Sequence, residues 1–458
     1  MSNLLLVRHG ESIGNANGII QGQTDYGLSQ SGREGVGVLT NINVDRFNKY
    51  NRIICSDLKR TSETAQIINS KVNKPLYYDK LLREVYAGIL DGVSKNTADE
   101  VYGEYFNIWK KRGDLDKIPF AETGDELQSR VLMFLEQYLY NESDDIIVSH
   151  AAFLRSLINT VMIRDRRFQI DLNYDNIYEL SDVWSNLDVK VHDIAKNSIV
   201  HEITTYEKKY IMKKTNHESI EMLKREKDLL RYLNDYIKTP RIISFTFKSD
   251  YNLKVLEYAN GINVEDRSLT ENEIKNTLRE VSVLKQALKR YPYSHTYEDL
   301  DISADFLSTL NDINDSKIKS IGFDAYSNTS FRSCLDEDTI QLVHDDLHRN
   351  NILYDNEQPV LLDFEGLKNT SSAYQLASHI AINYLLHDNS FNLNYLLKLY
   401  PEEVERDYIK SLIIYRLLKG YNFFDKRYTE SREKNDYSFV KKYINSIYAM
   451  ERDRWKQL

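Results

Sequence analysis

Cysteine is scarce in this chain of 458 residues, which contains only Cys55 and Cys334. Two cysteines cannot build a disulfide framework, so the sequence indicates a reducing compartment, and we expect a cytoplasmic protein. Long apolar runs are also missing: no stretch approaches the roughly 20 apolar residues of a membrane-spanning helix, and we expect no membrane partner. The apolar run at the N-terminus, Leu4–Val7, is too short for a cleavable signal peptide.

An excess of positive charge is absent as well. The formal net charge is -9, which argues against nucleic acid as a partner because phosphate backbones are bound by clustered Lys and Arg. Hydrophobic residues make up 41% and charged residues 28%, as in globular proteins. The length predicts two or three domains, although no internal repeat or low-complexity linker marks a division.

The first half of the chain alternates buried strand patterns with helical patterns. Apolar runs at Leu4–Val7, Arg52–Ser56 and Asp145–Ser149 predict strands, and amphipathic stretches at Leu58–Ser70 and Ala151–Met162 predict helices. Strands that alternate with helices predict a three-layer α/β domain with a mostly parallel sheet. We assign it residues 1–186.

The pattern changes near residue 187. Ile199–Thr205 and Lys209–Lys213 alternate as hairpin strands, and a charged helix is predicted over Ser219–Tyr236. Helical patterns dominate the later part of the chain. This order predicts an α+β two-lobed domain at 187–458, with a small lobe at about 187–259 and a large helical lobe at about 260–458.

Reactive residues follow the predicted strands of the first domain. Ligands of parallel sheets bind at the carboxyl ends of strands, where Arg8-His9, Arg60 and His150 would gather. A histidine that attacks phosphorus must be neutral and must lie beside cations that bind the phosphoryl oxygens. Glu84 is a candidate proton donor to the leaving oxygen.

These segments resemble the histidine phosphatase superfamily, which is related to cofactor-dependent phosphoglycerate mutases. The matching stretches, in order, are LVRHGES, Asn15, SDLKRTSETA at 56–65, LREVYAGILDG at 82–92 and VSHAAFLRSL at 148–157. The resemblance implies that His9 is phosphorylated, that Arg8, Arg60 and His150 form the phosphate pocket with Asn15 at its rim, and that Glu84 is the acid. It implies no cofactor for this domain.

Two details modify this resemblance. Ala151-Ala152 stands where the family often has Gly-Gly, which would narrow the pocket without changing the chemistry. Mutases of this group carry a longer substrate-covering insertion than the Val93–Thr123 segment, so a phosphatase is favoured over a mutase.

A second set of reactive residues lies in the last third of the chain. The loop His344-Asp345-Asp346-Leu347-His348-Arg349-Asn350-Asn351 places Asp346 as the base for an acceptor hydroxyl. Asn351 and Asp363 are candidate Mg²⁺ ligands, because hard cations prefer oxygen donors. His344 is expected to hold the loop, and either role remains open for His348.

Nucleotide-binding residues are predicted upstream. Lys213, at the end of an apolar triplet, is preferred over Lys214 as the phosphate-binding lysine, with Glu226 on the next helix as its partner. The segment Val255–Ala259 resembles a hinge whose backbone at Glu257 and Ala259 bonds the nucleotide base.

Together these residues resemble the aminoglycoside phosphotransferase and choline kinase group, which implies ATP or GTP with Mg²⁺. The chain departs from that group in having Asp345 where glycine is usual and in lacking glycine at 195–198. An acidic segment, Asp299–Asp338, is expected near the acceptor pocket, although a solvated acidic face is favoured.

We therefore predict a bifunctional enzyme, a phosphomonoester hydrolase and a phosphotransferase with an alcohol acceptor. Its partners are a nucleotide and small hydroxyl and phosphorylated substrates, in successive steps of one metabolic or surface-glycan pathway. Two alternatives stay open: a regulatory kinase/phosphatase switch that sets one effector level, and a phosphate- or nucleotide-sensing scaffold with an inactive site.

Overall fold

The computed structural model describes most of the chain, with short gaps. The described residues are 3–111, 115–138, 143–161, 177–180, 183, 188–195, 198–205, 208–216, 219–248, 250–264, 267–386, 393–431 and 434–455. Contacts group the chain into two compact units, Met1–Glu218 with Ile242–Tyr258, and Ser219–Arg241 with Ala259–Leu458. The boundary predicted near residue 187 lies outside the described residues. Within these ranges, no helix has both the length and the apolarity to cross a membrane.

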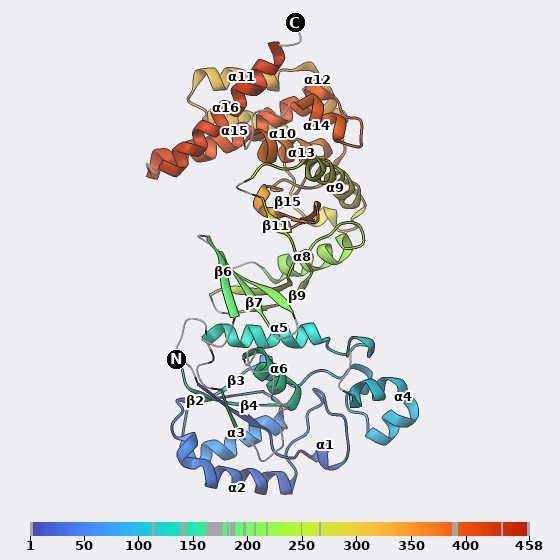
Figure 1. The fold of residues 1–458 in the computed structure, drawn as a ribbon, viewed down its shortest axis with the longest axis vertical. Helices are drawn as coiled ribbons and strands as arrows, with labels where there is room; N and C mark the ends of the chain where they lie inside the picture. The colour runs from blue at the N-terminus through green and yellow to red at the C-terminus, as the bar shows by residue number, and fades with distance from the viewer. Residues whose placement is uncertain are drawn as a thin grey trace. The chain divides into compact units, whose positions relative to one another are not determined.

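A five-stranded sheet of order β3-β2-β4-β1-β5 forms the centre of the first unit (Figure 1). Four strands run parallel, namely β1 (Leu4–Arg8), β2 (Arg52–Cys55), β3 (Leu76–Tyr78) and β4 (Asp145–Ser149). The edge strand β5 (Ile177–Leu180) is antiparallel to β1. The parallel strands align their carboxyl ends, so the residues that follow β1, β2 and β4 meet at one edge.

Side chains alternate between the two faces of this sheet, and each face has its own helical layer. Leu5 and Val7 pack with α2 (Gln30–Phe47) and α3 (Lys59–Val72). Leu4 and Leu6 pack with α5 (Gly124–Leu135) and α6 (Ala151–Val161) on the other face. The predicted three-layer α/β fold is therefore confirmed.

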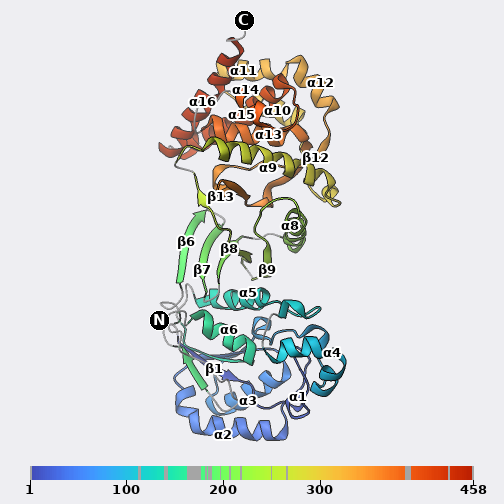
Figure 2. The same cartoon turned by 45° about the vertical axis from the view of Figure 1, so that its right-hand side comes forward.

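A second, antiparallel sheet belongs to the same unit and packs against α5. Its order is β6-β7-β8-β10-β9, and its strands are β6 (Asp188–Ala195), β7 (Ser198–Thr204), β8 (Lys209–Thr215), β9 (Ile242–Phe247) and β10 (Asn252–Glu257). Leu132 and Met133 of α5 form one buried cluster with Met212, Leu253 and Val255 of the sheet. Figure 2 shows the strands beside α5. One helix thus contributes to the cores of both sheets.

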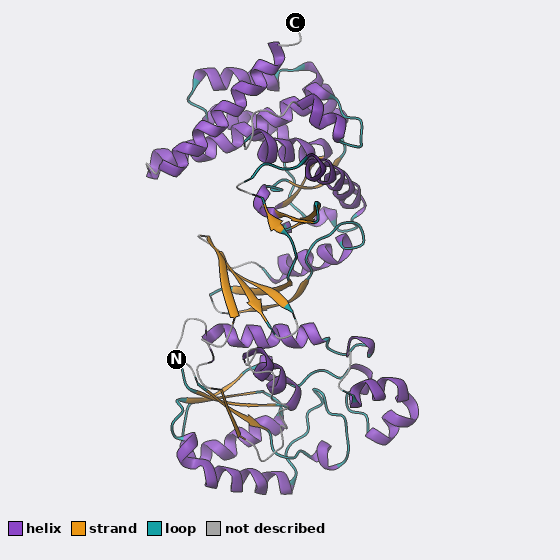
Figure 3. Cartoon of the chain, viewed as in Figure 1, coloured by secondary structure: helices purple, strands orange, loops and turns teal. Residues whose placement is uncertain are grey.

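The second unit is mostly helical (Figure 3). Two small sheets, β12-β15 and β11-β13-β14, hold its loops: β11 (Ile262–Asn263), β12 (Ile340–His344), β13 (Ile352–Asp355), β14 (Gln358–Leu361) and β15 (Leu367–Ser371). The main helices are α8 (Ile220–Leu233), α9 (Glu271–Arg290), α10 (Ile302–Asp312), α11 (Ser316–Tyr326), α12 (Thr329–Glu337), α13 (Ser372–Ile380), α14 (Leu393–Leu399), α15 (Arg406–Ser431) and α16 (Lys434–Trp455). The predicted α+β character is confirmed.

Part of the acidic segment at Asp299–Asp338 has a structural role. The Asp301 carboxylate accepts a hydrogen bond from the Ala304 amide and begins α10. Asp315 accepts from the amides of Lys317 and Ile318 and begins α11. Such caps satisfy amides that have no partner within the helix. These two aspartates are therefore accounted for by helix capping.

Candidate active sites

His9 follows β1 and lies at the carboxyl edge of the parallel sheet. Its ring Nδ1 donates to the Gly10 carbonyl oxygen at 2.7 Å, which leaves the lone pair of the ring on Nε2. Burial lowers the pKa of His9 well below 6.5, and the positive charges of Arg60 and Arg8 lower it further. The ring is therefore neutral at pH 7, as a nucleophile requires.

The backbone beside His9 must approach α2 closely. A Cβ atom at Gly10 would lie 2.5 Å from Val36 Cγ2 and 2.9 Å from the Gly32 carbonyl oxygen. The Gly10 amide also donates to Thr64 Oγ1 at 3.1 Å. Glycine is thus required here by space, and it allows the His9 backbone to lie close to α2 and to α3, the helix that carries Arg60.

Arg60 and His150 lie beside His9, as the sequence predicts. The His150 ring centroid is 5.1 Å from that of His9, and its Nε2 is 3.0 Å from Ser56 Oγ. Burial lowers the pKa of His150 well below 6.5, with further lowering by Arg60. Arg60, only 1% exposed, donates to the carbonyl oxygens of Gly22 and Thr24. The site therefore combines two neutral imidazoles with a buried guanidinium.

Glu84 lies in the loop after Leu82, and its side chain contacts the first turn of α6, the helix that follows His150. Its carboxylate accepts from the Ala152 amide at 3.1 Å and from the Val85 amide at 3.0 Å. The Ala-Ala departure from the family pattern thus leaves this amide available to the acid. The first turn of α6 therefore positions Glu84 through the Ala152 amide, and His150 directly precedes that turn.

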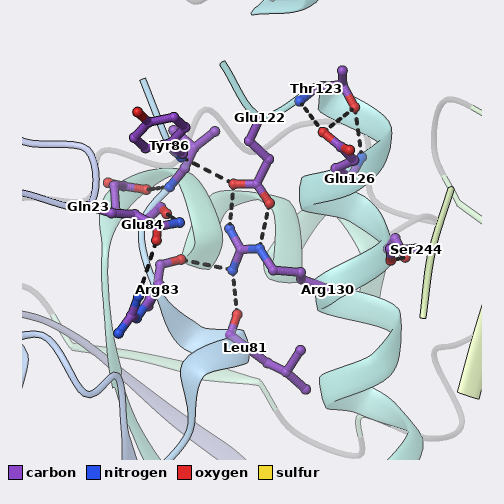
Figure 4. A network of polar contacts seen from close by, with 12 residues as sticks. Gln23, Leu81, Arg83, Glu84, Tyr86, Glu122, Thr123, Glu126, Arg130 and Ser244 are labelled. Atoms are coloured by element: carbon purple, nitrogen blue, oxygen red, sulfur yellow. Dashed lines mark hydrogen bonds and ion pairs between the residues drawn. The ribbon is translucent and has the colours of Figure 1, made fainter. Parts of the chain in front are cut away.

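Arg130 of α5 supports the loop that carries Glu84, and our sequence analysis missed it. Its guanidinium forms a bidentate pair with Glu122 at 2.5 and 2.8 Å (Figure 4). It also donates to the carbonyl oxygens of Leu81 and Arg83, the latter at 2.9 Å. The contacts with Leu81 and Arg83 join residues distant in sequence, so no local motif reveals them. A capping box of Thr123 and Glu126 begins α5 just before this residue.

Asn15 lies in the short helix α1 (Ile13–Ala16). Its Oδ1 accepts from Ser12 Oγ at 2.8 Å and from the Ser12 amide at 3.2 Å, and Ser12 Oγ bonds to Gln21. These contacts use the side-chain oxygen, and only the Nδ2 donor of Asn15 is left to face a ligand.

The second set of reactive residues lies in the loop between β12 and β13. Asp346, with a side chain 54% exposed, is held through its backbone: its amide donates to His344 Nδ1 at 3.3 Å, and its carbonyl oxygen accepts from His348 and from Asn351 Nδ2. His348 Nε2 is 3.8 Å from the Asp346 carboxylate. The loop leaves the Asp346 carboxylate largely in solvent, where an acceptor can reach it.

Asn351 and Asp363 are linked through the backbone. The Leu362 amide donates to the Asn351 carbonyl oxygen at 2.8 Å, and Asp363 follows with a left-handed backbone at φ 58°. Because Asn351 Nδ2 is used by Asp346, its Oδ1 remains as an oxygen donor. An amide oxygen and a carboxylate are suitable ligands for Mg²⁺. The residues present therefore fit this ion.

His344 and Arg416 lie beside the acidic loop. Burial lowers the pKa of His344, although the charges of Asp345, Asp346 and Asp363 oppose this shift. Arg416 of α15, which our sequence analysis missed, donates to Ser378 Oγ at 3.2 Å, and Ser378 Oγ donates to the Asp345 carbonyl oxygen. Burial lowers the pKa of Arg416, but the neighbouring Tyr374, Tyr443 and aspartates outweigh this and raise it.

The two adjacent lysines of β8 point to opposite faces of their sheet. Lys214 pairs with Glu136 at 2.9 Å on the face that packs on α5. Lys213 therefore lies on the other face, directly opposite Lys254 of β10. This arrangement favours Lys213 over Lys214 as the nucleotide lysine.

The remaining predicted nucleotide residues belong to different parts of the fold. Glu226 is buried on α8 in the second unit, whereas Lys213 belongs to the first, so their pairing stays a prediction. Glu257 ends β10, and Ala259 begins the second unit. The predicted hinge thus lies where the chain leaves the first unit and enters the second.

Two family models match the chain. Residues 4–180 match the histidine phosphatase superfamily (branch 1), and residues 190–408 match the phosphotransferase enzyme family. "Phosphoglycerate mutase-like protein 4" of Arabidopsis thaliana is 30% identical over 186 residues, which are 40% of this chain and 80% of that protein. "Probable phosphoglycerate mutase GpmB" of Escherichia coli O139:H28 is 35% identical over 169 residues, 35% of this chain and 75% of that protein.

Solved structures also resemble the N-terminal part. The alpha-ribazole phosphatase from Shigella flexneri is 26% identical, with 35% of this chain and 79% of that chain covered and a TM-score of 0.32. The family models and the curated relatives carry the conclusion. The chain belongs to the histidine phosphatase superfamily in its N-terminal part and to the phosphotransferase enzyme family in the part that follows, and it is a bifunctional phosphatase and kinase.

Proposed function

We propose that the two parts of the chain act in succession on one small molecule. The phosphotransferase part transfers a nucleotide γ-phosphate to a hydroxyl of a sugar, amino sugar or similar compound. The phosphatase part then hydrolyses a phosphomonoester at another position of that compound. The observation that carries the proposal is the pair of buried, neutral rings of His9 and His150, 5.1 Å apart, in one chain with the Asp346 loop.

In the hydrolytic step, His9 Nε2 attacks phosphorus and the bond to the leaving oxygen breaks. Arg8, Arg60 and His150 bind the phosphoryl oxygens, and Asn15 donates to them from the rim. Glu84 gives its proton to the leaving oxygen. Water then attacks the phosphohistidine and releases inorganic phosphate, and its proton returns to Glu84. The neutral state of His9 supports this assignment, because a protonated ring has no lone pair on Nε2.

In the transfer step, Asp346 accepts a hydrogen bond from the acceptor hydroxyl and takes its proton as the bond to the γ-phosphorus forms. The exposure of its carboxylate supports this role. Lys213 is proposed to bind the nucleotide phosphates with Glu226 as its ion-pair partner, and the backbone at Glu257 and Ala259 to hold the base of ATP or GTP. Mg²⁺, when bound to Asn351 and Asp363, neutralises the nucleotide phosphates.

Hydrolysis is favoured over a mutase reaction, although the two curated relatives named above are called mutases or mutase-like. The segment Val93–Thr123, which contains α4 (Lys95–Lys110), is short for a substrate-covering insertion. With a short covering segment, water can reach the phosphohistidine after the first step, and the phosphate is then released to solvent.

Action at two positions follows from the opposed chemistry of the parts. If both parts acted on the same ester, the pair would consume nucleotide without making a product. If the kinase part adds a phosphate at one position and the phosphatase part removes the phosphate from another, the product is a monophosphate with its phosphate at the new position.

A panel assay tests the proposal. The full chain, His9→Ala and Asp346→Ala are incubated with sugars, amino sugars and their phosphates, together with ATP or GTP and Mg²⁺, and both nucleotide consumption and phosphate release are measured. We expect His9→Ala to accumulate a bisphosphorylated compound that the wild type converts to a monophosphate. If both parts act only on the same position of every compound, the sequential scheme is wrong.

A further inference from the structure

A large cavity opens beside Glu84 in the first unit. Its volume is about 970 Å³, and its walls come from α4, α5, α6 and the turn between β7 and β8. Glu84 and Ala152, which bonds to Glu84, are both part of its lining. Because the proposed acid must contact the leaving oxygen, a group released from phosphate can extend from Glu84 into this cavity.

The size of the cavity indicates a large leaving group. Small-molecule sites typically measure about 300–1,000 Å³, and this cavity lies near the upper end of that range. A three-carbon acid would leave most of it filled with water. A leaving group of the size of a sugar phosphate uses the space better.

The lining offers both an apolar face and hydroxyl partners. Trp109 of α4 provides a flat apolar wall, against which the ring face of a sugar can pack. Between α5 and α6, Gln128 donates to Thr160 Oγ1 at 2.7 Å and accepts from Ser156 Oγ at 3.0 Å. Such a row of polar groups suits several hydroxyls.

An arginine in the lining is suited to bind an anion on the leaving group. Among the lining residues that the structure describes, four are basic and three are acidic, one acidic residue is the candidate proton donor, and Lys110 and Lys208 form ion pairs with Asp99 and Asp125. Arg155 projects from α6 three residues after Ala152, so it lies on the same side of the helix as the Glu84 contact. A guanidinium binds a phosphate with two parallel hydrogen bonds.

A second cation comes from the stretch that matches the phosphotransferase family. Lys208 lies in the turn between β7 and β8, lines the cavity, and forms an ion pair with Asp125 of α5. Tyr210, two residues later, donates to the same carboxylate at 2.8 Å. These contacts fix the turn against α5, so the kinase part of the sequence supplies a wall of the phosphatase cavity.

We propose that this cavity binds a leaving group that carries a second phosphate, held by Arg155 and approached by Lys208, so that the phosphatase substrate is a sugar or polyol bisphosphate. The inference rests on the proposed function, because a kinase that phosphorylates an already phosphorylated compound makes such a bisphosphate. Arg155 and Lys208 are then specificity-determining residues, and they take no part in breaking the bond.

Paired substrates test this assignment in the full chain. Phosphate release is measured with fructose 1,6-bisphosphate, glucose 1,6-bisphosphate and ribose 1,5-bisphosphate, each beside its monophosphate, and with para-nitrophenyl phosphate. We expect at least one bisphosphate to be preferred about 10-fold or more in kcat/KM, and Arg155→Gln to reduce that preference by about 10- to 100-fold, the range for a lost charged hydrogen bond. Lys208→Gln should reduce it by a smaller factor.

The matched control is Arg46→Gln, which removes an arginine that pairs with Glu179 away from the cavity and should keep the preference. The inference is overturned if no bisphosphate is preferred, or if Arg155→Gln lowers turnover of bisphosphates and para-nitrophenyl phosphate equally. Turnover of para-nitrophenyl phosphate that is lost in His9→Ala verifies the phosphatase independently. Its absence in the wild type would instead refute the proposed function.

Discussion

The two reactive sites of this chain are built in opposite ways. The His9 site joins residues from four separate segments, and its rings are buried so deeply that both remain neutral. The Asp346 loop is nearly continuous in sequence, is held by hydrogen bonds of its backbone to nearby backbone and side-chain groups, and leaves the Asp346 side chain 54% exposed. The difference teaches that a site whose nucleophile is its own side chain must bury that side chain and hold it neutral before the substrate binds. A site in which both reactants are bound molecules can leave its base exposed to solvent until they bind.

The strongest test of this comparison removes the nucleophile. His9→Ala should lower phosphate release by at least about 10⁴-fold, because the covalent intermediate of the proposed mechanism forms on this ring. Nucleotide-dependent transfer should persist in the same protein. Loss of both activities together would mean that the two sites are not independent.

The reciprocal variant should have a smaller effect. Asp346→Ala is expected to lower phosphoryl transfer by about 10³-fold, within the usual range for a positioned general base. Hydrolysis of para-nitrophenyl phosphate serves as the control and should be retained. Transfer at the wild-type rate would exclude Asp346 as the base.

Adjacent lysines permit a sharper test of the nucleotide site. Lys213→Met should lower transfer by about 10²-fold, because it removes a charge from the nucleotide phosphates. Lys214→Met leaves the buried Glu136 carboxylate without its cation and should lower the free energy of unfolding by about 1–3 kcal/mol, with transfer changed less than about threefold. If Lys214→Met inactivates the kinase in a folded protein, our assignment is reversed.

The smallest effect concerns pH. The pKa values of His9 and His150 lie below 6.5 in the folded chain. As pH falls through 6.5, these histidines therefore bind protons in the unfolded chain but remain neutral in the folded chain. Stability from this source is present above pH 6.5 and decreases below it, by up to about 1.4 kcal/mol per pH unit for each ring. Denaturant unfolding at several pH values measures this slope, which should be smaller in His150→Gln. An equal slope in that variant would contradict it.

The sequence predicted best what depends on local patterns. The strand Asp145–Ser149 was predicted at its observed bounds, because a fully buried parallel strand is a continuous apolar run. The helix that follows was found as Ala151–Val161. By contrast, Arg130 and Arg416 act through carbonyl and hydroxyl oxygens far along the chain, and no spacing in the sequence reveals such partners. The face of β8 on which each lysine lies became clear only from the neighbour that Lys214 contacts.

The two-sided helix α5 has a consequence for how this protein can be divided. On one side Arg130 supports the loop of the phosphatase acid (Figure 4). On the other side Leu132 and Met133 pack against the strands of the kinase sequence, and Ser129 is hydrogen-bonded to Ser244. A fragment that ends between the two family matches, at 180–190, would expose this apolar stripe to water. We expect such a fragment to self-associate, and a cut placed after Tyr258 with the 219–241 segment retained to give a better-behaved protein. The two family segments thus share a hydrophobic core at α5. Point substitutions are therefore better suited than truncation to separate the two activities.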